Sequence, residues 1–316
     1  MSAHRRQRSR LRWMSSAIFG ATLAAGLAQA SAAHAQQEPK VEWNPEWSRV
    51  RLVEGGAILA LTFASIEINA APYANHAHWS KPILFDDAAR SFFKSDSYDT
   101  QKLAAALSDQ LYFGMVLAPY VIDNYIVALG VHQNADVALQ MTLIDMQSLG
   151  LSGVVALGAE HAVGRSRPYV QDCGPGPNAP DKVGYNHCDG VGDFQSFMSG
   201  HAAATFTMAG LTCAHHQHLP LYGGGFADVM ACATMIALAS TTGILRMVAD
   251  RHWASDVMTG TAVGILSGYV LPEWLHYGFG DSRKRVKTTF QTSFGYIAPV
   301  PQMYAGGGGL GVVGVF

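Results

Sequence analysis

Charged side chains are scarce in this chain of 316 residues. Asp, Glu, Lys and Arg together make up 14% of it, whereas water-soluble domains usually carry about a quarter. Hydrophobic residues make up 49%. This excludes an intrinsically disordered protein, because a chain this apolar can bury enough surface to offset the entropy lost on folding. The folded surface is therefore either sparse in charge or partly covered by something apolar.

Cysteine is also scarce, with four residues at positions 173, 188, 213 and 232. They form no C-x-x-C pair, which argues against a zinc site. In an exported protein an even number of cysteines predicts two disulfides, for which three connectivities exist. Cys173 and Cys188 flank a stretch rich in Gly, Pro and Asn, so we expect a bond between them that closes a long loop. The pairing of Cys213 and Cys232 stays open.

The first 35 residues are typical of a secretory signal peptide. Five arginines lie within residues 5–12, an apolar run of small residues covers 14–27, and Ala33-His34-Ala35 offers a cleavage site ahead of Gln36. The apolar run is shorter than the roughly 20 residues that span a bilayer, which favours cleavage over an uncleaved anchor. We therefore expect residues 1–35 to be removed and the protein to be periplasmic or secreted.

The expected mature chain is negatively charged. Cleavage would lower the number of basic residues from 21 to 16, against 23 acidic ones. A nucleic-acid partner is therefore disfavoured, because phosphate backbones require a basic face.

Six apolar stretches have the length of helices, and segments rich in Pro, Gly, Asn or Asp separate them. They cover residues 51–71, 103–131, 135–164, 202–214, 227–248 and 253–277. We therefore predict an all-α fold, a helical bundle that occupies residues 36–287. Residues 288–316 lose the helical period and are rich in Tyr, Phe, Val and Gly. There we expect a β-hairpin-like tail that turns around residues 306–309 and packs on the bundle.

Acidic residues interrupt the apolar stretches or lie at their ends, at Glu54, Glu67, Asp123, Asp145, Glu160, Asp228 and Asp250. Charged side chains inside a bilayer are rare and energetically unfavourable. A buried bundle tolerates them in a groove or at a helix end. This favours a compact helical domain, with peripheral membrane contact possible, over helices that cross the membrane. The membrane-crossing arrangement stays open as the alternative.

The segment RMVADRHWASD brings Arg246, His252 and Asp256 close together in sequence. His252 and Asp256 are four residues apart and would share one face of a helix. A carboxylate there can accept a hydrogen bond from one ring nitrogen, leaving the other free to attack phosphorus or hold a proton. Arg246 adds a guanidinium whose geometry matches phosphate oxygens. A surface His–Asp pair without chemistry is the alternative for this segment alone.

Two further segments supply complementary groups. Ser199 and Gly200 precede an apolar helical run, so backbone N–H groups at this helix start are expected to bind an anion. His201 would stand beside that anion and protonate a leaving oxygen. Arg167, in the segment Gly-Arg-Ser-Arg-Pro, offers a second guanidinium. Taken singly, Ser199 could be an ordinary helix cap and Arg167 a solvated cation, so the prediction depends on all three segments occurring in order.

These residues resemble the type 2 phosphatidic acid phosphatase superfamily, which includes bacterial class A acid phosphatases, lipid phosphate phosphatases and vanadium haloperoxidases. The resemblance extends over residues 160–256 and implies a helical bundle. It also implies that His252 is a nucleophile that forms a phosphohistidine, that Asp256 orients it, and that His201 is the general acid. By the same resemblance, the hydrolytic members need no metal, and the phosphoryl oxygens are held by Arg167, Arg246, Ser199 and the amide of Gly200.

Three positions depart from the family signature. Glu160 stands where the family has lysine, Met198 replaces a proline, and Leu245 replaces a serine. The last two are expected to matter little. Glu160 exchanges a cation for an anion, and it would repel a phosphoryl group unless it pairs with Arg165 or Arg167 or turns away. Glu160 and Arg165 are therefore candidate modulators of the site.

The sequence thus predicts an exported, metal-independent phosphatase that hydrolyses phosphate monoesters through a phosphohistidine. Its substrate would be a phosphorylated small molecule or a lipid head group, such as a lipid phosphate or pyrophosphate. No cofactor is expected, although vanadate would bind as a phosphate mimic. The alternatives are a vanadate-dependent haloperoxidase and a non-catalytic binding protein whose site Glu160 has spoiled.

Three histidines, His215, His216 and His218, lie beside Cys213 and include residue types that bind metals. They follow an apolar run, and no fourth ligand is evident elsewhere in the sequence. We therefore expect them in a solvated loop between helices rather than in a metal site.

Overall fold

The computed structural model describes residues 40–174, 180–188, 190, 192–278, 296–304 and 307–315, the last two segments by their backbone. The expected signal peptide, residues 1–35, lies outside the described residues. The chain divides into a unit that ends at Phe279 and a unit that begins at Gly280, and each is described by itself. The elements of the first unit are α2 (Leu52–Ala70), α3 (Asp86–Phe93), α4 (Tyr98–Pro119), η1 (Tyr120–Val131), α5 (Ala135–Val163), α6 (Val170–Cys173), β1 (Lys182–Val183), β2 (Asn186–His187), α7 (Gly200–His218), α8 (Phe226–Val248), α9 (Ala254–Ile265), η2 (Leu266–Val270) and η3 (Glu273–Tyr277).

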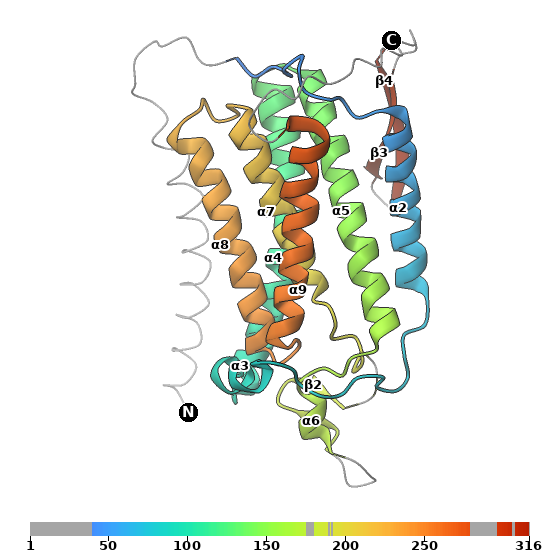
Figure 1. Cartoon of the computed structure of the whole chain (residues 1–316), viewed down its shortest axis with the longest axis vertical. Helices are drawn as coiled ribbons and strands as arrows, with labels where there is room; N and C mark the ends of the chain where they lie inside the picture. The colour runs from blue at the N-terminus through green and yellow to red at the C-terminus, as the bar shows by residue number, and fades with distance from the viewer. Residues whose placement is uncertain are drawn as a thin grey trace. The chain divides into compact units, whose positions relative to one another are not determined.

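The first unit is a bundle of helices, which confirms the predicted all-α fold (Figure 1). Its long helices run side by side, and α7 packs against α4, α5, α8 and α9. The short elements α3, α6 and β2 gather at one end of the bundle, which we call the α3/α6 end. Side-chain oxygens of Ser97, Asn134 and Ser199 cap the first turns of α4, α5 and α7, so polar residues fix where these helices begin.

Helices α7 and α9 approach so closely that their backbones touch. Both runs carry small residues every four positions, at Ser199, Ala203 and Thr207 on one and at Gly260, Gly264 and Gly268 on the other. A Cβ added to Gly264 would stand 2.6 Å from the carbonyl oxygen of Ala203. Small residues at this spacing let helices pack closely where apolar burial alone gives little drive to associate. The starts of α7 and α9 are therefore held together by backbone contact.

The second unit is described only as β3 (Tyr296–Tyr304) and β4 (Gly307–Val315), which pair as an antiparallel hairpin. Tyr296 is paired with Val315, and Tyr304 with Gly307. The predicted hairpin is therefore confirmed, and residues 307–309, which were expected at its turn, belong to β4. The packing of this tail on the helical domain stays a prediction.

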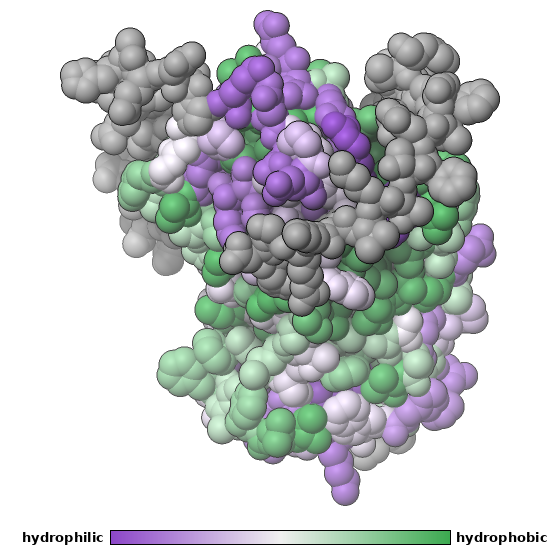
Figure 2. All heavy atoms as spheres, turned by 45° about the horizontal axis from the view of Figure 1, so that its top comes forward, coloured by the Kyte–Doolittle hydropathy of each residue, from purple (hydrophilic) through white to green (hydrophobic). Residues whose placement is uncertain are grey.

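Four helical segments are long and apolar enough to cross a membrane, judged by length and composition. They are Leu52–Ala70, Tyr98–Val131, Ala135–Val163 and Phe226–Val248. Large apolar side chains on them face outward, among them Phe63, Phe113, Leu117, Ile126 and Val229. Figure 2 shows hydrophobic side chains gathered over the middle of the molecule, below a hydrophilic end. Soluble monomers rarely expose so large an apolar surface, so the structure favours the membrane-crossing alternative.

Most of the acidic residues in the apolar stretches, whose presence favoured a domain that does not cross the membrane, are buried in the bundle. Glu54, Asp123, Asp145 and Asp228 are buried. Glu67 is exposed, but it lies near the end of α2. Ionisable groups in membrane helices characteristically face the interior of the bundle and pair there. Their presence in the sequence therefore does not exclude helices that cross a bilayer.

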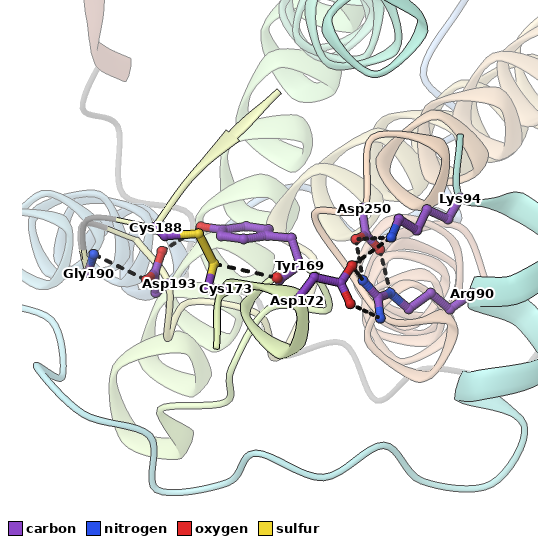
Figure 3. Close-up of a disulfide and its surroundings, with 9 residues drawn as sticks. All are labelled: Arg90, Lys94, Tyr169, Asp172, Cys173, Cys188, Gly190, Asp193 and Asp250. Atoms are coloured by element: carbon purple, nitrogen blue, oxygen red, sulfur yellow. Dashed lines mark hydrogen bonds and ion pairs between the residues drawn. A yellow bond between two sulfur atoms is a disulfide. The ribbon is translucent and has the colours of Figure 1, made fainter. Parts of the chain in front are cut away.

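The structure pairs all four cysteines. Cys173 is bonded to Cys188, as expected, and closes the loop that joins α6 to the β1–β2 pair (Figure 3). Cys213 is bonded to Cys232 and links α7 to α8. Two disulfides are typical of a protein that folds in an oxidising compartment.

The expectation of a solvated loop at residues 215–218 is wrong. His215, His216 and His218 lie in the last turn of α7, and the first two are buried. Each is bonded to its own acidic partner, namely Asp145, Asp228 and Glu273 respectively. The apolar run continues as a helix through these residues, because the buried carboxylates supply the partners that water would supply in a loop.

We predict that Gly264→Ala destabilises the protein by about 1–3 kcal/mol, because its methyl group would overlap the backbone of α7. Gly114→Ala is the matched control on α4, since a Cβ there would meet nothing within 4 Å. The control should be neutral or slightly stabilising. Thermal unfolding of both variants in detergent checks this, and equal melting temperatures for the two would contradict close packing of α7 and α9.

Candidate active site

The three sequence segments meet at the start of α7. A cavity of about 710 Å³ opens there between α2, α4, α5, α7 and α8. The predicted site residues that line it are Arg167, Gly200, His201, Arg246 and His252, together with Glu160. Residues separated by up to 92 positions in the sequence are thus gathered around one space, and most of their side chains are buried.

His252 presents one ring nitrogen to its surroundings and has the other engaged. Its Nδ1 lies 2.8 Å from the carbonyl oxygen of Ser196, and Nε2 makes no hydrogen bond to the described residues. A carbonyl oxygen can only accept, so Nδ1 carries the hydrogen and Nε2 has a free lone pair. Burial lowers the pKa of His252 well below its usual range, and the charges of Arg167 and Arg246 lower it further. The ring is therefore neutral at ordinary pH, and its Nε2 lone pair can act as a nucleophile.

The prediction that Asp256 bonds directly to His252 is wrong. The Asp256 carboxylate accepts bonds from Ser196 Oγ at 2.6 Å, from the backbone N–H of Trp253 at 2.9 Å, and from Arg165. Spacing along a helix placed the two residues correctly, but His252 stands just before α9, outside its first turn. Asp256 reaches His252 through Ser196, whose hydroxyl binds the carboxylate and whose carbonyl oxygen holds the imidazole.

Arg165 is a buried structural cation and does not modulate the cavity. Its Nη2 donates to Asp86 at 2.6 Å, and its Nη1 donates to Asp256 and to Ser255 Oγ. The guanidinium carbon also lies 3.9 Å from the centre of the Trp79 ring, a cation–π distance. These contacts commit Arg165 to the base of α9, so it does not pair with Glu160 as the sequence had allowed.

Two arginines remain available to an anion. Arg167 is buried, and its Nε and Nη1 have no hydrogen-bond partner among the described residues. Arg246 donates through Nη1 to Ser108 Oγ at 3.2 Å and to Asp109 at 3.1 Å, while its Nε has no described partner. Buried donors without partners are unfavourable unless a ligand satisfies them. The two guanidiniums therefore form a receptor for an oxyanion.

Asp109 is a site residue that the sequence analysis missed. Its Oδ1 lies 2.8 Å from Nε2 of His201 and also accepts the bond from Arg246. Burial and the charge of Arg246 lower the pKa of His201 to about 4, although Asp109 opposes them. The signal that could have found Asp109 is an ionisable residue in an apolar helix.

Ser199 does not have the expected place in the cavity. It is fully buried, is not among the residues that line the cavity, and its Oγ accepts from the backbone N–H of Ala202. It is the ordinary helix cap that the sequence left open as the alternative. Gly200, the first residue of α7, does line the cavity and brings the start of the helix to it.

Glu160 faces the cavity rather than turning away from it. A Cβ built on Gly200 would stand 3.5 Å from Oε1 of Glu160, and both groups line the cavity. The charges of Arg167 and Arg246 act on the same carboxyl group. An acidic side chain therefore lies at the start of α7, where the sequence predicted that an anion binds.

Residues on either side of the Cys173–Cys188 disulfide support the segment that carries Arg167 (Figure 3). Asp193 accepts from the hydroxyl of Tyr169 at 2.7 Å, and its backbone oxygen accepts from the N–H of Arg167 at 2.8 Å. Beside the loop, Arg90 bridges Asp172 and Asp250 at 2.6 and 2.7 Å. These bonds join the loop to the α8–α9 turn that leads to His252.

Comparison with known proteins gives two matches and one absence. Residues 144–279 match the model of the PAP2 superfamily. A stretch of 129 residues is 33% identical to the lipid A 1-phosphatase of Porphyromonas gingivalis, covering 41% of this chain and 22% of that protein. The match thus spans about a fifth of the length of that relative. No solved structure matches the chain.

We predict that Arg165→Met lowers the free energy of unfolding by about 3–5 kcal/mol, because it leaves the carboxylates of Asp86 and Asp256 buried and unpaired. Lys102→Met is the matched control, since Lys102 is exposed on α4. The control should change stability by less than about 0.5 kcal/mol. Thermal unfolding in detergent compares them, and a near-native Arg165→Met protein would refute the structural role of this cation.

Proposed function

Because residues 144–279 of this chain form a PAP2 superfamily domain, we propose that the protein is a phosphatase that hydrolyses lipid phosphate esters. The observation that carries the proposal is the convergence of a neutral His252, a second histidine and two under-bonded arginines on one cavity. A phosphoryl group has the charge and the acceptor oxygens that these guanidiniums require.

The proposed chemistry is a double displacement at phosphorus. Nε2 of His252 forms a bond to phosphorus while the bond from phosphorus to the ester oxygen breaks, and His201 supplies the proton that this oxygen needs. Water then attacks the phosphohistidine, His201 accepts the proton of the water, and the P–N bond breaks to release phosphate. Arg167 and Arg246 stabilise the charge on the phosphoryl oxygens in both steps. No step requires a metal.

Asp109 and Asp256 would prepare the two histidines for these steps. Asp109 holds the His201 ring by the 2.8 Å contact and favours its protonated form. A bound phosphoryl group, being negative, would favour that form further. Asp256 fixes Ser196, and the Ser196 carbonyl oxygen fixes the tautomer of His252.

The shape of the cavity supports a lipid substrate. From its charged end it extends along α2 and α5, where its lining is largely apolar and includes Ile66, Met146, Leu149 and Leu157. A small hydrophilic phosphate ester would leave this part unfilled, whereas an acyl chain would fill it. The name of the relative, a lipid A 1-phosphatase, points to the same substrate class.

We further propose that α2, α4–η1, α5 and α8 cross a membrane and that the catalytic end faces an oxidising compartment. The apolar outward faces of these helices support the first part. The Cys173–Cys188 bond at the α3/α6 end supports the second, because cytosolic thiols are kept reduced. Export by way of residues 1–35 would deliver this end to the periplasm.

We predict that His252→Ala abolishes hydrolysis of p-nitrophenyl phosphate while leaving the melting temperature close to that of the parent. His187→Ala is the matched control, because His187 is exposed on β2. Hydrolysis by the parent should survive a chelator. Substantial activity in His252→Ala would refute the mechanism. Bromide oxidation with added vanadate would instead favour the haloperoxidase, and no activity on either substrate would favour a binding protein.

We predict that Ile66→Trp lowers kcat/KM for a long-chain lipid phosphate several-fold but leaves p-nitrophenyl phosphate unaffected. Ile66 lines the apolar part of the cavity, so a larger side chain there would compete with an acyl chain. Phe63→Trp is the matched control, since Phe63 is equally exposed on α2 but does not line the cavity. Equal losses on both substrates would mean that the apolar part does not bind lipid.

A further inference from the structure

Glu160 is the group in the cavity that the proposed chemistry leaves without a role. Its carboxylate lies against Gly200 at the start of α7 and shares the cavity with both arginines and both histidines. The phosphoryl group must come into this same space to reach Nε2 of His252. An ionised Glu160 and a phosphoryl dianion would then be neighbours.

Titratable side chains from several elements lie around Glu160. They are Tyr73 from the α2–α3 connection, Asp109 and Tyr112 from α4, Tyr120 from η1, His161 from α5, Arg167 from the α5–α6 connection, His201 from α7, Arg246 from α8 and His252 from the turn before α9. With His201 and His252 neutral, two guanidiniums face two carboxylates, those of Asp109 and Glu160. These charges nearly cancel, so a phosphoryl dianion would bring in two uncompensated negative charges.

Protonation of Glu160 resolves this conflict. A carboxylate can only accept hydrogen bonds and therefore repels a phosphoryl oxygen, but a carboxylic acid donates one. Two acidic groups that share a site avoid ionising together for the same reason. The acid form would also leave the Gly200 N–H and the two guanidiniums available to the phosphoryl oxygens.

We propose that the phosphoryl group binds this site together with one proton from solvent, which is carried by Glu160. Glu160 then donates a hydrogen bond to a phosphoryl oxygen and takes the place of a cationic donor. This inference rests on the proposed function and specifies how the site selects its ligand: affinity for the phosphoryl group falls as the pH rises and Glu160 ionises. The protein would therefore work best in an acidic medium, although its two arginines keep their charge.

The experiment measures binding of inorganic phosphate to the full chain in detergent by calorimetry. Repeating the titration in buffers of different ionisation enthalpy gives the number of protons taken up on binding. The parent is compared with Glu160→Gln, which keeps a neutral donor but cannot titrate. Glu67→Gln is the matched control, since Glu67 is exposed on α2 outside the cavity. Protonation of His201 and of phosphate itself is common to all three proteins and cancels in the comparison.

In slightly alkaline buffer the parent and Glu67→Gln should take up about one proton more than Glu160→Gln. Across the pH range in which Glu160 ionises, phosphate affinity of the parent should fall by up to about tenfold more per pH unit than that of Glu160→Gln. The optimum of kcat/KM should likewise move to higher pH in Glu160→Gln, which a merely structural role would not cause.

Equal proton uptake by the parent and Glu160→Gln would overturn the inference. It would mean that Glu160 moves out of the cavity or remains ionised beside the ligand, for instance to bind an amine on the substrate. In that case phosphate would still bind, and the proposed phosphatase would stand. If none of the three proteins bound phosphate at any pH, the proposed function would fail and the inference with it.

Discussion

The buried guanidinium of Arg165 organises the catalytic end of this protein. It binds Asp86 at the start of α3 and Asp256 in the first turn of α9, and it lies against the ring of Trp79. Arg165 thereby joins the segment that carries Trp79 and Asp86 to the start of α9, although these segments are far apart in the sequence. Asp256 passes the constraint to Ser196, whose carbonyl oxygen holds the imidazole of His252. The orientation of the His252 ring thus depends on an ion pair that does not line the cavity.

The arginines that line the cavity differ from Arg165 in the partners of their hydrogen-bond donors. Both terminal nitrogens of Arg165 are bonded to carboxylates, whereas Arg167 and Arg246 line the cavity, and the Nε and Nη1 of Arg167 and the Nε of Arg246 have no partner among the described residues. An anion is the group that completes their hydrogen bonding, and the apolar lining beyond them suits the remainder of an amphiphilic molecule. The carboxyl group of Glu160 lies in the same cavity. The proposed recognition would therefore depend on the protonation state of one acidic side chain as well as on shape.

The sequence predicted the helical bundle, the terminal hairpin, the Cys173–Cys188 bond and the convergence of Arg167, Gly200, His201, Arg246 and His252 on one cavity. These succeed because histidines and arginines stand out in a chain with few charges, and because helical length is visible in apolar runs. The partner of Asp256 could not be predicted, since spacing along a helix says which face a residue occupies but not which distant group competes for it. Asp109 and Ser196 were missed because their bonds to His201 and His252 cross 92 and 56 positions. The outward apolar faces of the long helices were not predicted. The sequence shows that these helices contain acidic residues, but it does not show that most of those residues are buried.

The contact between α7 and α9 has a consequence for how the protein tolerates its surroundings. Bilayers differ in thickness, and helices that face lipid respond by tilting. Where glycines bring two backbones into direct contact, as at Gly264 and Ala203, the pair must tilt as one rigid body. His201 lies at the start of α7 and His252 just before α9, so the separation of the two histidines is set by this pair. In the proposed membrane protein, the geometry of the reaction would then not change with the lipid composition of the bilayer.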